Sequence, residues 1–383
     1  MKRLLLLGGG HAHVQVVRAF GLSPPHDTEV ALMNTTRLTA YSGMLPGFVA
    51  GHYTRAESHI DLAALCAIFG VRFIEEEACE IDLAGRSVAG RRGGRHAYDL
   101  LCVDTGSTPP LDRIEGADRY ALPVKPAERF IAWVERSMAG DAVTTGRSLA
   151  VVGGGAAGVE LVLALDHRLR RQIPARGFAL RLVTDAARIL GEFPGRARKL
   201  AEQILRQQGI EVHTDARVAR VDDAGIVLAS GIRIDADHVI LTTGAAPHPM
   251  LARCGLQTDP RGFIVVSAGL QSLSHPEVFA CGDVATVLAH LRPKAGVYAV
   301  RQGPPLARNL RRVLAGAPPL PFVPQRRYLV LVSTGRKHAI ATRNGLTLQG
   351  EWVWRWKDWI DRRFVARFDA HRIRANRSSA GRA

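Results

Sequence analysis

The chain has 383 residues, more than one domain usually holds, so we expect two domains with separate hydrophobic cores. Hydrophobic residues make up 47% of it and glycine occurs 38 times, which excludes a largely disordered chain and favours a folded α/β protein. The formal charge of +16 favours an anionic partner but does not decide between a membrane surface, a nucleic acid and an anionic cofactor.

The five cysteines are scattered and form no Cys-x-x-Cys pair. This spacing predicts neither a metal site nor a redox dithiol, and it favours a reducing, cytoplasmic compartment. The apolar run Leu4 to Leu7 is too short for a signal peptide and is expected to be a buried strand. No apolar stretch approaches the ~18 residues that a membrane-spanning helix needs.

Two apolar strands each run into a glycine-rich turn that precedes a helical pattern. The first is Leu4 to Leu7 before Gly8-Gly9-Gly10, and the second is Leu149 to Val152 before Gly153-Gly154-Gly155. The helix that follows such a turn presents free N–H groups and a partial positive charge to a diphosphate, and only glycine allows the close approach. The repetition predicts two dinucleotide-binding units.

The second turn has glycine at all three fingerprint positions, whereas the first has a histidine at the third. These positions hold Gly153, Gly155 and Gly158 in the second turn, and Gly8, Gly10 and His13 in the first. The histidine predicts looser packing of helix on strand. We expect His11 and His13 to form hydrogen bonds at the start of the helix, beside the diphosphate, rather than to act as catalysts.

The residue that usually binds a ribose follows the second strand of each unit. In the first unit Asn34 stands there in place of a carboxylate. In the second unit Asp185 would bind the ribose hydroxyls of NADH, whereas Arg188 would accept the extra phosphate of NADPH. Asp185 slightly favours NADH, and the choice stays open.

Each unit later reaches another strand that ends in a turn of small residues. Leu100 to Val103 precedes Asp104-Thr105-Gly106-Ser107, and His238 to Leu241 precedes Thr242-Thr243-Gly244-Ala245. A further strand then leads to Gly282-Asp283, and a helical run follows from Val297 to Leu314. We expect the chain to have returned to its first domain at this point.

The last segment follows a proline-rich linker at 318–324 and contains a strand and an amphipathic helix. Its apolar stripe has four-residue spacing and consists of Trp352, Trp356, Ile360, Phe364 and Phe368. Tryptophans followed by Arg372, Arg374 and Arg377 suit an anchor lying on anionic lipid. The alternative is a helix that packs on the first domain or on a partner in a homodimer. No nucleic-acid module accompanies it, so we expect no nucleic acid as a partner.

This arrangement resembles the pyridine nucleotide-disulfide oxidoreductase superfamily, in which an FAD domain is interrupted by an NAD(P)H domain. The resemblance implies an α/β fold with two Rossmann-like three-layer domains and a C-terminal α+β extension. Residues 1–120 and 251–317 would form the FAD domain, residues 121–250 the NAD(P)H domain and residues 318–383 the extension. In the family's pattern Asp283 binds FAD, Thr105-Gly106 and Thr243-Gly244 are the domain crossovers, and Glu160 lies where nicotinamide meets flavin. A carboxylate that satisfies the helix dipole is the alternative for Glu160.

The disulfide reductases of this superfamily carry a Cys-x-x-x-x-Cys motif, but here residues 41–51 contain no cysteine. Electrons would therefore leave the flavin for another acceptor. The segments Gly8 to His13, Tyr41 to Gly47, Lys294 to Gly303 and Trp354 to Arg362 resemble the type II NADH dehydrogenase-like branch. Within that branch they look like the flavoprotein found fused to selenophosphate synthetase.

The resemblance predicts hydride transfer from NAD(P)H to FAD, and then electron transfer to a small acceptor such as a quinone. Type II NADH dehydrogenases carry two glutamines beside the quinone, and their places hold Val297 and Arg301, while Gln302 is retained beside them. A soluble acceptor and a flavin-bound redox sensor therefore stay open as alternatives. The protein would be cytoplasmic, either free or peripheral on the cytoplasmic face of the membrane.

The helix that starts near Gly296 and Val297 would direct its N–H groups at the flavin, and Lys294 would add positive charge there or be plain surface. Tyr41 belongs to the segment expected at the flavin. Met44, Leu45 and Pro46 would cover its ring, with ordinary core packing as the alternative.

Overall fold

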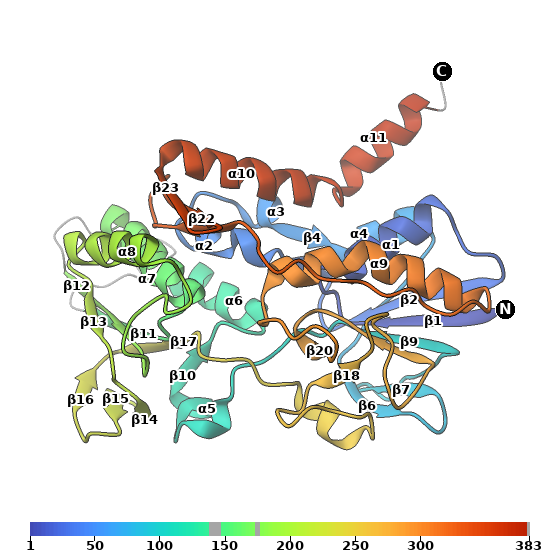
Figure 1. The fold of residues 1–383 in the computed structure, drawn as a ribbon, viewed down its shortest axis with the longest axis horizontal. Helices are drawn as coiled ribbons and strands as arrows, with labels where there is room; N and C mark the ends of the chain where they lie inside the picture. Colours follow the sequence, from blue (N-terminus) through green and yellow to red (C-terminus); the bar gives the residue numbers. More distant parts are fainter. Residues whose placement is uncertain (138–146, 173–176, 381–383) are drawn as a thin grey trace.

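The computed structural model describes residues 1–137, 147–172 and 177–380, and Figure 1 shows its arrangement. Two five-stranded parallel sheets lie side by side, and a C-terminal unit of three strands and two helices lies along one side of both. Helices and small antiparallel sheets cover the two large sheets. The expected α/β fold with Rossmann-like units is confirmed.

The first sheet has the strand order β19-β9-β1-β2-β5. Its strands are β1 (Lys2–Leu7), β2 (Thr28–Asn34), β5 (Arg72–Glu75), β9 (Leu100–Val103) and β19 (Val278–Ala280). The last four residues of β1 are all buried, as expected of a parallel strand that is covered on both faces. On one face lie α1 (His13–Leu22), α4 (Leu62–Phe69) and α9 (Gly296–Leu314), and on the other lies the antiparallel sheet of β6 (Ala78–Asp82), β7 (Ser87–Gly90) and β8 (Arg95–Ala97) (Figure 1).

The second sheet repeats this plan with the order β10-β17-β11-β12-β13. Its strands are β10 (Ala121–Pro123), β11 (Arg147–Val152), β12 (Phe178–Val183), β13 (Glu211–His213) and β17 (His238–Leu241). The accompanying helices are α6 (Ala127–Ser137), α7 (Ala156–Gln172) and α8 (Gly195–Gln207), and the accompanying antiparallel sheet is β14 (Val218–Asp222), β15 (Gly225–Leu228) and β16 (Arg233–Asp235). The core of this unit is separate from that of the first.

The first strand of each unit stands where the order of strands reverses. β1 lies between β2 and β9, and β11 lies between β12 and β17. The carboxyl end of a strand at such a switch point opens into a crevice between the crossover connections, where α/β proteins bind ligands. Both glycine-rich turns follow these two strands.

Shorter elements connect these sheets. They are β3 (Leu38–Ala40), η1 (Ser42–Met44), α2 (Leu45–Val49), α3 (Arg55–Ser58), β4 (His59–Asp61), η2 (Leu111–Arg113), α5 (Ala117–Tyr120), η4 (Pro249–Arg253), β18 (Ile264–Val266), η5 (Gly282–Val284) and β20 (Ala285–Val287).

The C-terminal unit is an antiparallel sheet followed by two helices. It consists of β21 (Val330–Ser333), β22 (Ala339–Arg343), β23 (Leu346–Gly350), α10 (Glu351–Ala366) and α11 (Ala370–Ala380). Successive side chains of a strand point to opposite faces. Accordingly Ile340 on β22 is buried in the core of the second unit, while Ala339 and Ala341 are buried in the core of the first. The two faces of β22 therefore belong to different cores, and the strand contacts α8 of the second unit and α10 of the C-terminal unit.

The amphipathic helix is present as α10, but the predicted single stripe is wrong. Phe364 and Phe368 are buried, whereas the side chains of Trp352, Trp356 and Trp359 are 54%, 38% and 57% exposed. The buried face of α10 consists of Val353, Trp354, Lys357, Asp361, Phe364 and Val365. A buried ion pair on this face rotates the helix away from the orientation that apolar spacing predicts. Arg372 and Arg374 are exposed on α11, and the side chain of Arg377 lies outside the described residues.

No helix in the described part of the chain combines the length and the hydropathy that a membrane span requires.

Candidate functional site

The first glycine-rich turn connects β1 to α1. Gly8 has a φ of 97°, a left-handed value that favours glycine, and a Cβ there would lie 2.5 Å from the carbonyl oxygen of Asp104. Within the described residues, the N–H groups of Gly10 and His11 have no protein acceptor. Because they stand at the start of α1, these groups are free to bind an anion.

Asn34, which we predicted to contact a ribose, has both polar atoms of its side chain engaged in this turn. Its Oδ1 accepts the N–H of Gly9 over 2.8 Å, and its Nδ2 donates to the carbonyl of Thr36 over 2.8 Å. Asn34 therefore positions the glycine turn, and a ribose would have to share Oδ1.

Asp104 was not singled out from the sequence, yet it caps α1 from the side of the sheet. Its Oδ2 accepts the N–H groups of Ala12 and His13 over 3.0 and 3.2 Å. Burial raises the pKa of this carboxyl. Thr242 has the corresponding place after β17, where its hydroxyl donates to the carbonyl of Val152. The sequence signal that could have indicated Asp104 was an acidic residue directly after a buried strand.

The Gly282-Asp283 turn is held by three side chains from other parts of the chain. Gly282 donates its N–H to Oε1 of Gln302 over 2.6 Å. The carboxylate of Asp283 accepts from Lys125 Nζ over 2.6 Å and from Ser107 Oγ over 3.2 Å. Gln302, which we noted only as retained, therefore fixes the predicted FAD-binding turn on α9.

The two crossover turns pair with each other between the units. Thr108 and Ala246 exchange backbone hydrogen bonds of 2.9 and 2.7 Å as an antiparallel bridge. Gly106 and Gly244, just before them, have positive φ values of 72° and 49°. Thr105 Oγ1 is buried without a protein partner among the described residues, so a polar atom of a ligand would satisfy it.

The second glycine-rich turn packs more closely than the first. A Cβ on Gly158 would lie 1.8 Å from the carbonyl oxygen of Gly153, whereas a Cβ on Gly155 would meet nothing within 4 Å. The open space at Gly155 is the cradle that a diphosphate needs at the start of α7. Asp185 and Arg188 are both exposed just beyond β12, where either could face a ribose.

The N-terminus of α9 meets the first glycine turn and the segment around Tyr41. A Cβ on Gly296 would lie 2.9 Å from Ser42 Oγ and 3.9 Å from the ring of His11. His11 Nε2 is 2.9 Å from Ser42 Oγ, and its ring centre is 5.2 Å from that of Tyr41. Burial lowers the pKa of His11 to about 4, so the ring is neutral at pH 7. The predicted residues His11, Tyr41 and Gly296 are thus brought together.

Met44 and Pro46 are buried, and Met44 belongs to the core of the first unit. That they cover the flavin ring stays a prediction. Val297 is half-buried in the first turn of α9.

Lys294 precedes α9, and its side chain is bound to β20. Its Nζ donates to the carbonyl of Ala285 over 2.5 Å and to Thr286 Oγ1 over 3.1 Å, and it lies 4.0 Å from the ring centre of Phe263. Burial lowers the pKa of Lys294 to about 8. No hydrogen bond or ion pair joins it to Glu160 in the described residues, so the two predicted catalytic residues are not brought into contact.

Glu160 on α7 connects the second unit to the C-terminal sheet. Its Oε1 accepts the N–H of Ser333 over 2.7 Å. Burial raises the pKa of Glu160 to about 7, while the charge of Lys357 acts in the opposite direction. This carboxyl therefore changes its protonation near neutral pH.

A buried ion pair on α10 reaches the same region. Lys357 Nζ lies 2.7 Å from Asp361 Oδ2, and each side chain is 8% exposed. Lys357 also donates to the carbonyl of Gly43 over 2.5 Å, and the hydroxyl of Tyr41 donates to Asp361. Sequence reasoning missed this pair because a Lys and an Asp four residues apart usually mark a solvated helix face.

A cavity of about 590 Å³ opens beside the first turn of α9. Its lining includes Tyr298, Tyr328, Arg292, Arg326, Arg327 and Arg343. Four arginines against the single carboxylate of Glu192 make this cavity electropositive and suited to an anionic ligand.

The unclaimed N–H groups, the open space at Gly155 and the unpartnered hydroxyl of Thr105 fit two bound dinucleotides. Residues 2–303 match the model of the family described as pyridine nucleotide-disulphide oxidoreductase. The chain belongs to this family. The cofactors of the family, FAD and NAD(P)H, are accordingly those of this chain.

Among curated proteins, the chain is similar to an NADH dehydrogenase-like protein of Mycobacterium tuberculosis, with 29% identity over 223 residues. That match covers 56% of this chain and 56% of the relative's length. A demethylphylloquinone reductase of Synechocystis is 26% identical over 367 residues, with 91% of this chain and 88% of the relative covered.

Among solved structures, the fold is similar to the sulfide:quinone oxidoreductase of Aquifex aeolicus, with a TM-score of 0.79 and 17% identity over 97% of this chain and 92% of that one. It is also similar to NDH2 of Plasmodium falciparum in complex with NADH, with a TM-score of 0.78 and 13% identity over 95% of this chain and 98% of that one. Identities at this level show a shared fold.

Proposed function

We propose that this family member transfers a hydride from NAD(P)H to FAD and passes the electrons to a small acceptor that is not a disulfide, with a quinone as the first candidate. The proposal places FAD in residues 1–120 and 251–317 and NAD(P)H in residues 121–250. We also propose that the chain is related to the flavoprotein found fused to selenophosphate synthetase.

The choice of an acceptor that is not a disulfide rests on the absence of a thiol beside the expected flavin site. The segment at residues 41–51, which contacts His11 and the start of α9, contains no cysteine. The five cysteines lie at positions 66, 79, 102, 254 and 281. Cys102 is buried on β9, and Cys281 is buried directly after β19. Disulfide reduction needs a thiolate next to the flavin, so it is excluded as the second half-reaction.

When bound, the flavin accepts a hydride and supplies electrons to the acceptor. The chain itself positions the groups. The free N–H groups after β1 and the turn at Asp283 would hold the diphosphate and sugar of FAD, and the open cradle at Gly155 would hold NAD(P)H. The N-terminus of α9 would direct N–H groups and a partial positive charge at the flavin.

Glu160 would meet the nicotinamide. Its carboxyl has one oxygen bound to Ser333 and a pKa of about 7, so near neutral pH the other oxygen donates or accepts depending on protonation. That property suits a carboxamide, which offers both an N–H donor and a carbonyl acceptor.

The quinone candidate rests on the demethylphylloquinone reductase that matches nearly the whole chain. A soluble anionic acceptor is the second candidate, because the cavity beside Tyr298 is lined by four arginines and Arg301 stands exposed on α9. The two candidates differ in charge. Measuring how fast the reduced flavin is reoxidised by a quinone and by a soluble anion would show which kind the protein uses.

We further propose that the exposed tryptophans of α10 contact a membrane surface. Trp352, Trp356 and Trp359 lie on the exposed face of α10, and the guanidinium of Arg363 lies 5.2 Å from the ring centre of Trp359. Tryptophan beside arginine suits the headgroup region of anionic lipid.

Replacing all three tryptophans by serine tests this proposal better than truncation, because truncation would also remove the buried face of α10. We expect the variant to lose flotation with anionic liposomes, whereas loss of a dimer with no change in flotation would instead indicate a protein partner.

Anaerobic mixing of the FAD-loaded chain with NADH, and separately with NADPH, tests the central proposal. We expect the flavin absorbance to fall with at least one nucleotide and to recover when a soluble quinone analogue is added. The variant Gly155→Ala is the matched control, since it should keep its flavin and need more nucleotide for the same rate. Bound nucleotide without any flavin reduction would overturn the enzyme in favour of a redox sensor.

A further inference from the structure

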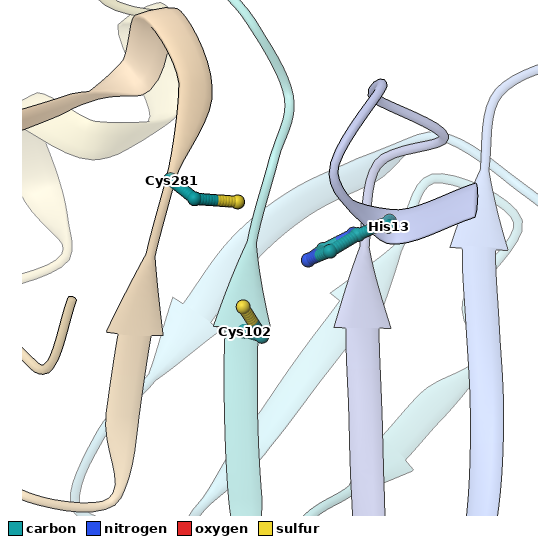
Figure 2. A group of neighbouring side chains, drawn as sticks. All are labelled: His13, Cys102 and Cys281. Carbon is teal, nitrogen blue, oxygen red and sulfur yellow. The ribbon is translucent and has the colours of Figure 1, made fainter. Parts of the chain in front are cut away.

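Three metal-binding side chains meet beneath the first glycine-rich turn. His13 at the start of α1, Cys102 on β9 and Cys281 just after β19 direct their side chains toward one another (Figure 2). One ligand atom from each residue lies within 4.8 Å of the other two, and all three side chains are 0% exposed. They come from widely separated parts of the sequence, so no spacing motif could predict the cluster.

The ring of His13 is held in the orientation and tautomer that a metal ligand needs. Its Nδ1 lies 2.7 Å from the carbonyl oxygen of Gly8, which only an N–H can satisfy, so Nδ1 carries the proton. In the neutral ring Nε2 then carries the lone pair, and it is buried without a hydrogen-bond partner in the described residues. A histidine that ligates a metal typically donates its other ring N–H to a carbonyl or carboxylate in this way.

The two thiols are placed by neighbouring parallel strands. β9 and β19 pair with Cys102 opposite Phe279, and the N–H of Cys281 then donates to the carbonyl of Val103 over 3.0 Å. The sulfur atoms are thus held on a rigid sheet. Both cysteines are free.

We propose that His13, Cys102 and Cys281 bind a zinc ion that links α1 to β9 and β19. Sulfur and imidazole nitrogen are the ligands that zinc prefers in structural sites. In a tetrahedral site, of which these side chains supply three ligands and a water would supply the fourth, two sulfur atoms lie about 3.8 Å apart and a nitrogen and a sulfur about 3.5 Å apart. The cluster therefore needs to contract by about 1.3 Å at most. The binding step replaces two S–H bonds by two Zn–S bonds and releases two protons to solvent, and no electron is transferred.

Charge favours a divalent ion. Zinc bound to two thiolates and a neutral imidazole has no net charge, which a fully buried site tolerates. Copper(I) with the same ligands would leave one negative charge close to the buried carboxyl of Asp104.

The zinc ion would replace a packing contact that the second unit obtains from glycine. Gly158 allows α7 to approach β11 closely, and His13 occupies the corresponding place in α1. A metal bond through the histidine would hold α1 on the sheet instead. It would also connect the two segments of the first sheet, because Cys281 directly follows β19, the strand added after the second unit.

The metal content of the full chain, purified with its flavin from cells grown with added zinc, tests this proposal. We expect about one zinc per chain. The variants Cys102→Ser, Cys281→Ser and His13→Gly should each lose it, and His13→Gly also restores the third glycine of the turn. Cys66→Ser is the matched control, because Cys66 is a buried free cysteine of the same core that lies outside the cluster.

X-ray absorption spectroscopy of the wild-type protein measures the ligands of the zinc directly. It therefore tests the proposal even if a variant does not fold. We expect two sulfur atoms at about 2.3 Å from the zinc and at least one nitrogen at about 2.0 Å. Wild-type protein without zinc, zinc retained in all three variants, or a shell without sulfur would each overturn the site. Copper in place of zinc, or a disulfide between Cys102 and Cys281, would also overturn it.

Discussion

Removing the positive charge of the buried pair on α10 should destabilise the protein in a way that depends strongly on pH. At 2.7 Å the attraction between Lys357 and Asp361 is about 6 kcal/mol for an effective dielectric constant of about 20. Burying two charges costs several kcal/mol per ion, so the pair as a whole contributes little net stability. In Lys357→Met, however, the carboxylate of Asp361 would be left buried without its partner.

The cost of this variant is limited by protonation of Asp361. Protonating a carboxyl with an unfolded pKa of about 3.9 costs about 4 kcal/mol at pH 7 and about 1.5 kcal/mol at pH 5. Because the folded variant would hold a proton that the unfolded chain releases, its stability falls as the pH rises above about 4. Lys357→Met should therefore lose about 4 kcal/mol at pH 7 and less than half of that at pH 5.

Urea denaturation followed by tryptophan fluorescence measures these values, since Trp354 lies on the same face of α10. The double variant Lys357→Met/Asp361→Leu should recover most of the loss, because it leaves no charge buried. Arg355→Met is the matched control. It breaks the exposed pair of Arg355 with Glu351, where the side chains are 73% and 61% exposed, and should change stability little. A loss in Lys357→Met that is equal at the two pH values, or no larger than that of the control, would refute this reasoning.

Three further predictions concern the site. Glu160→Gln should keep the bond to Ser333 but remove the group with a pKa of about 7. Because burial raises this pKa from 4.5 to about 7, the wild type loses about 3 kcal/mol of stability as the pH rises from about 4.5 through 7, and the variant should be more stable by about that amount at pH 9 in urea denaturation. Its rate of flavin reduction should no longer change near pH 7. Gly158→Ala should destabilise the second unit by about 1–3 kcal/mol because its Cβ meets the carbonyl of Gly153, whereas Gly155→Ala should leave the thermal midpoint unchanged and weaken NADH binding in a titration. Asp283→Asn should lower the affinity for FAD about 10-fold or more, because it removes the charged contact with Lys125. Flavin fluorescence after dialysis measures how much FAD is retained, and unchanged retention would contradict the role of this turn.

The parallel strands and glycine turns were predictable because their physical signals are local. β9 and β17 have the expected bounds, Leu100 to Val103 and His238 to Leu241, since a strand covered on both faces is apolar throughout. The turns after β1 and β11 needed only a few consecutive residues to be recognised.

The parts that could not be predicted depend on contacts between distant residues. The orientation of α10 follows from the contacts of Lys357 and Asp361 with Gly43 and Tyr41, which apolar spacing does not report. Asn34 and Lys294 were predicted to face the cofactors. Their polar atoms instead bind backbone and side-chain groups of the protein itself. His13, Cys102 and Cys281 meet only because β19 joins the sheet next to β9.

The position of β22 has a mechanical consequence. Ile340 is packed in one core and the flanking alanines Ala339 and Ala341 in the other, and the C-terminal unit that holds them contacts α3 and α4 of the first unit as well as α7 and α8 of the second. A rotation of one nucleotide-binding unit against the other about the crossover turns would therefore have to break contacts of the C-terminal unit with one of them. We expect the C-terminal unit to restrict such a rotation.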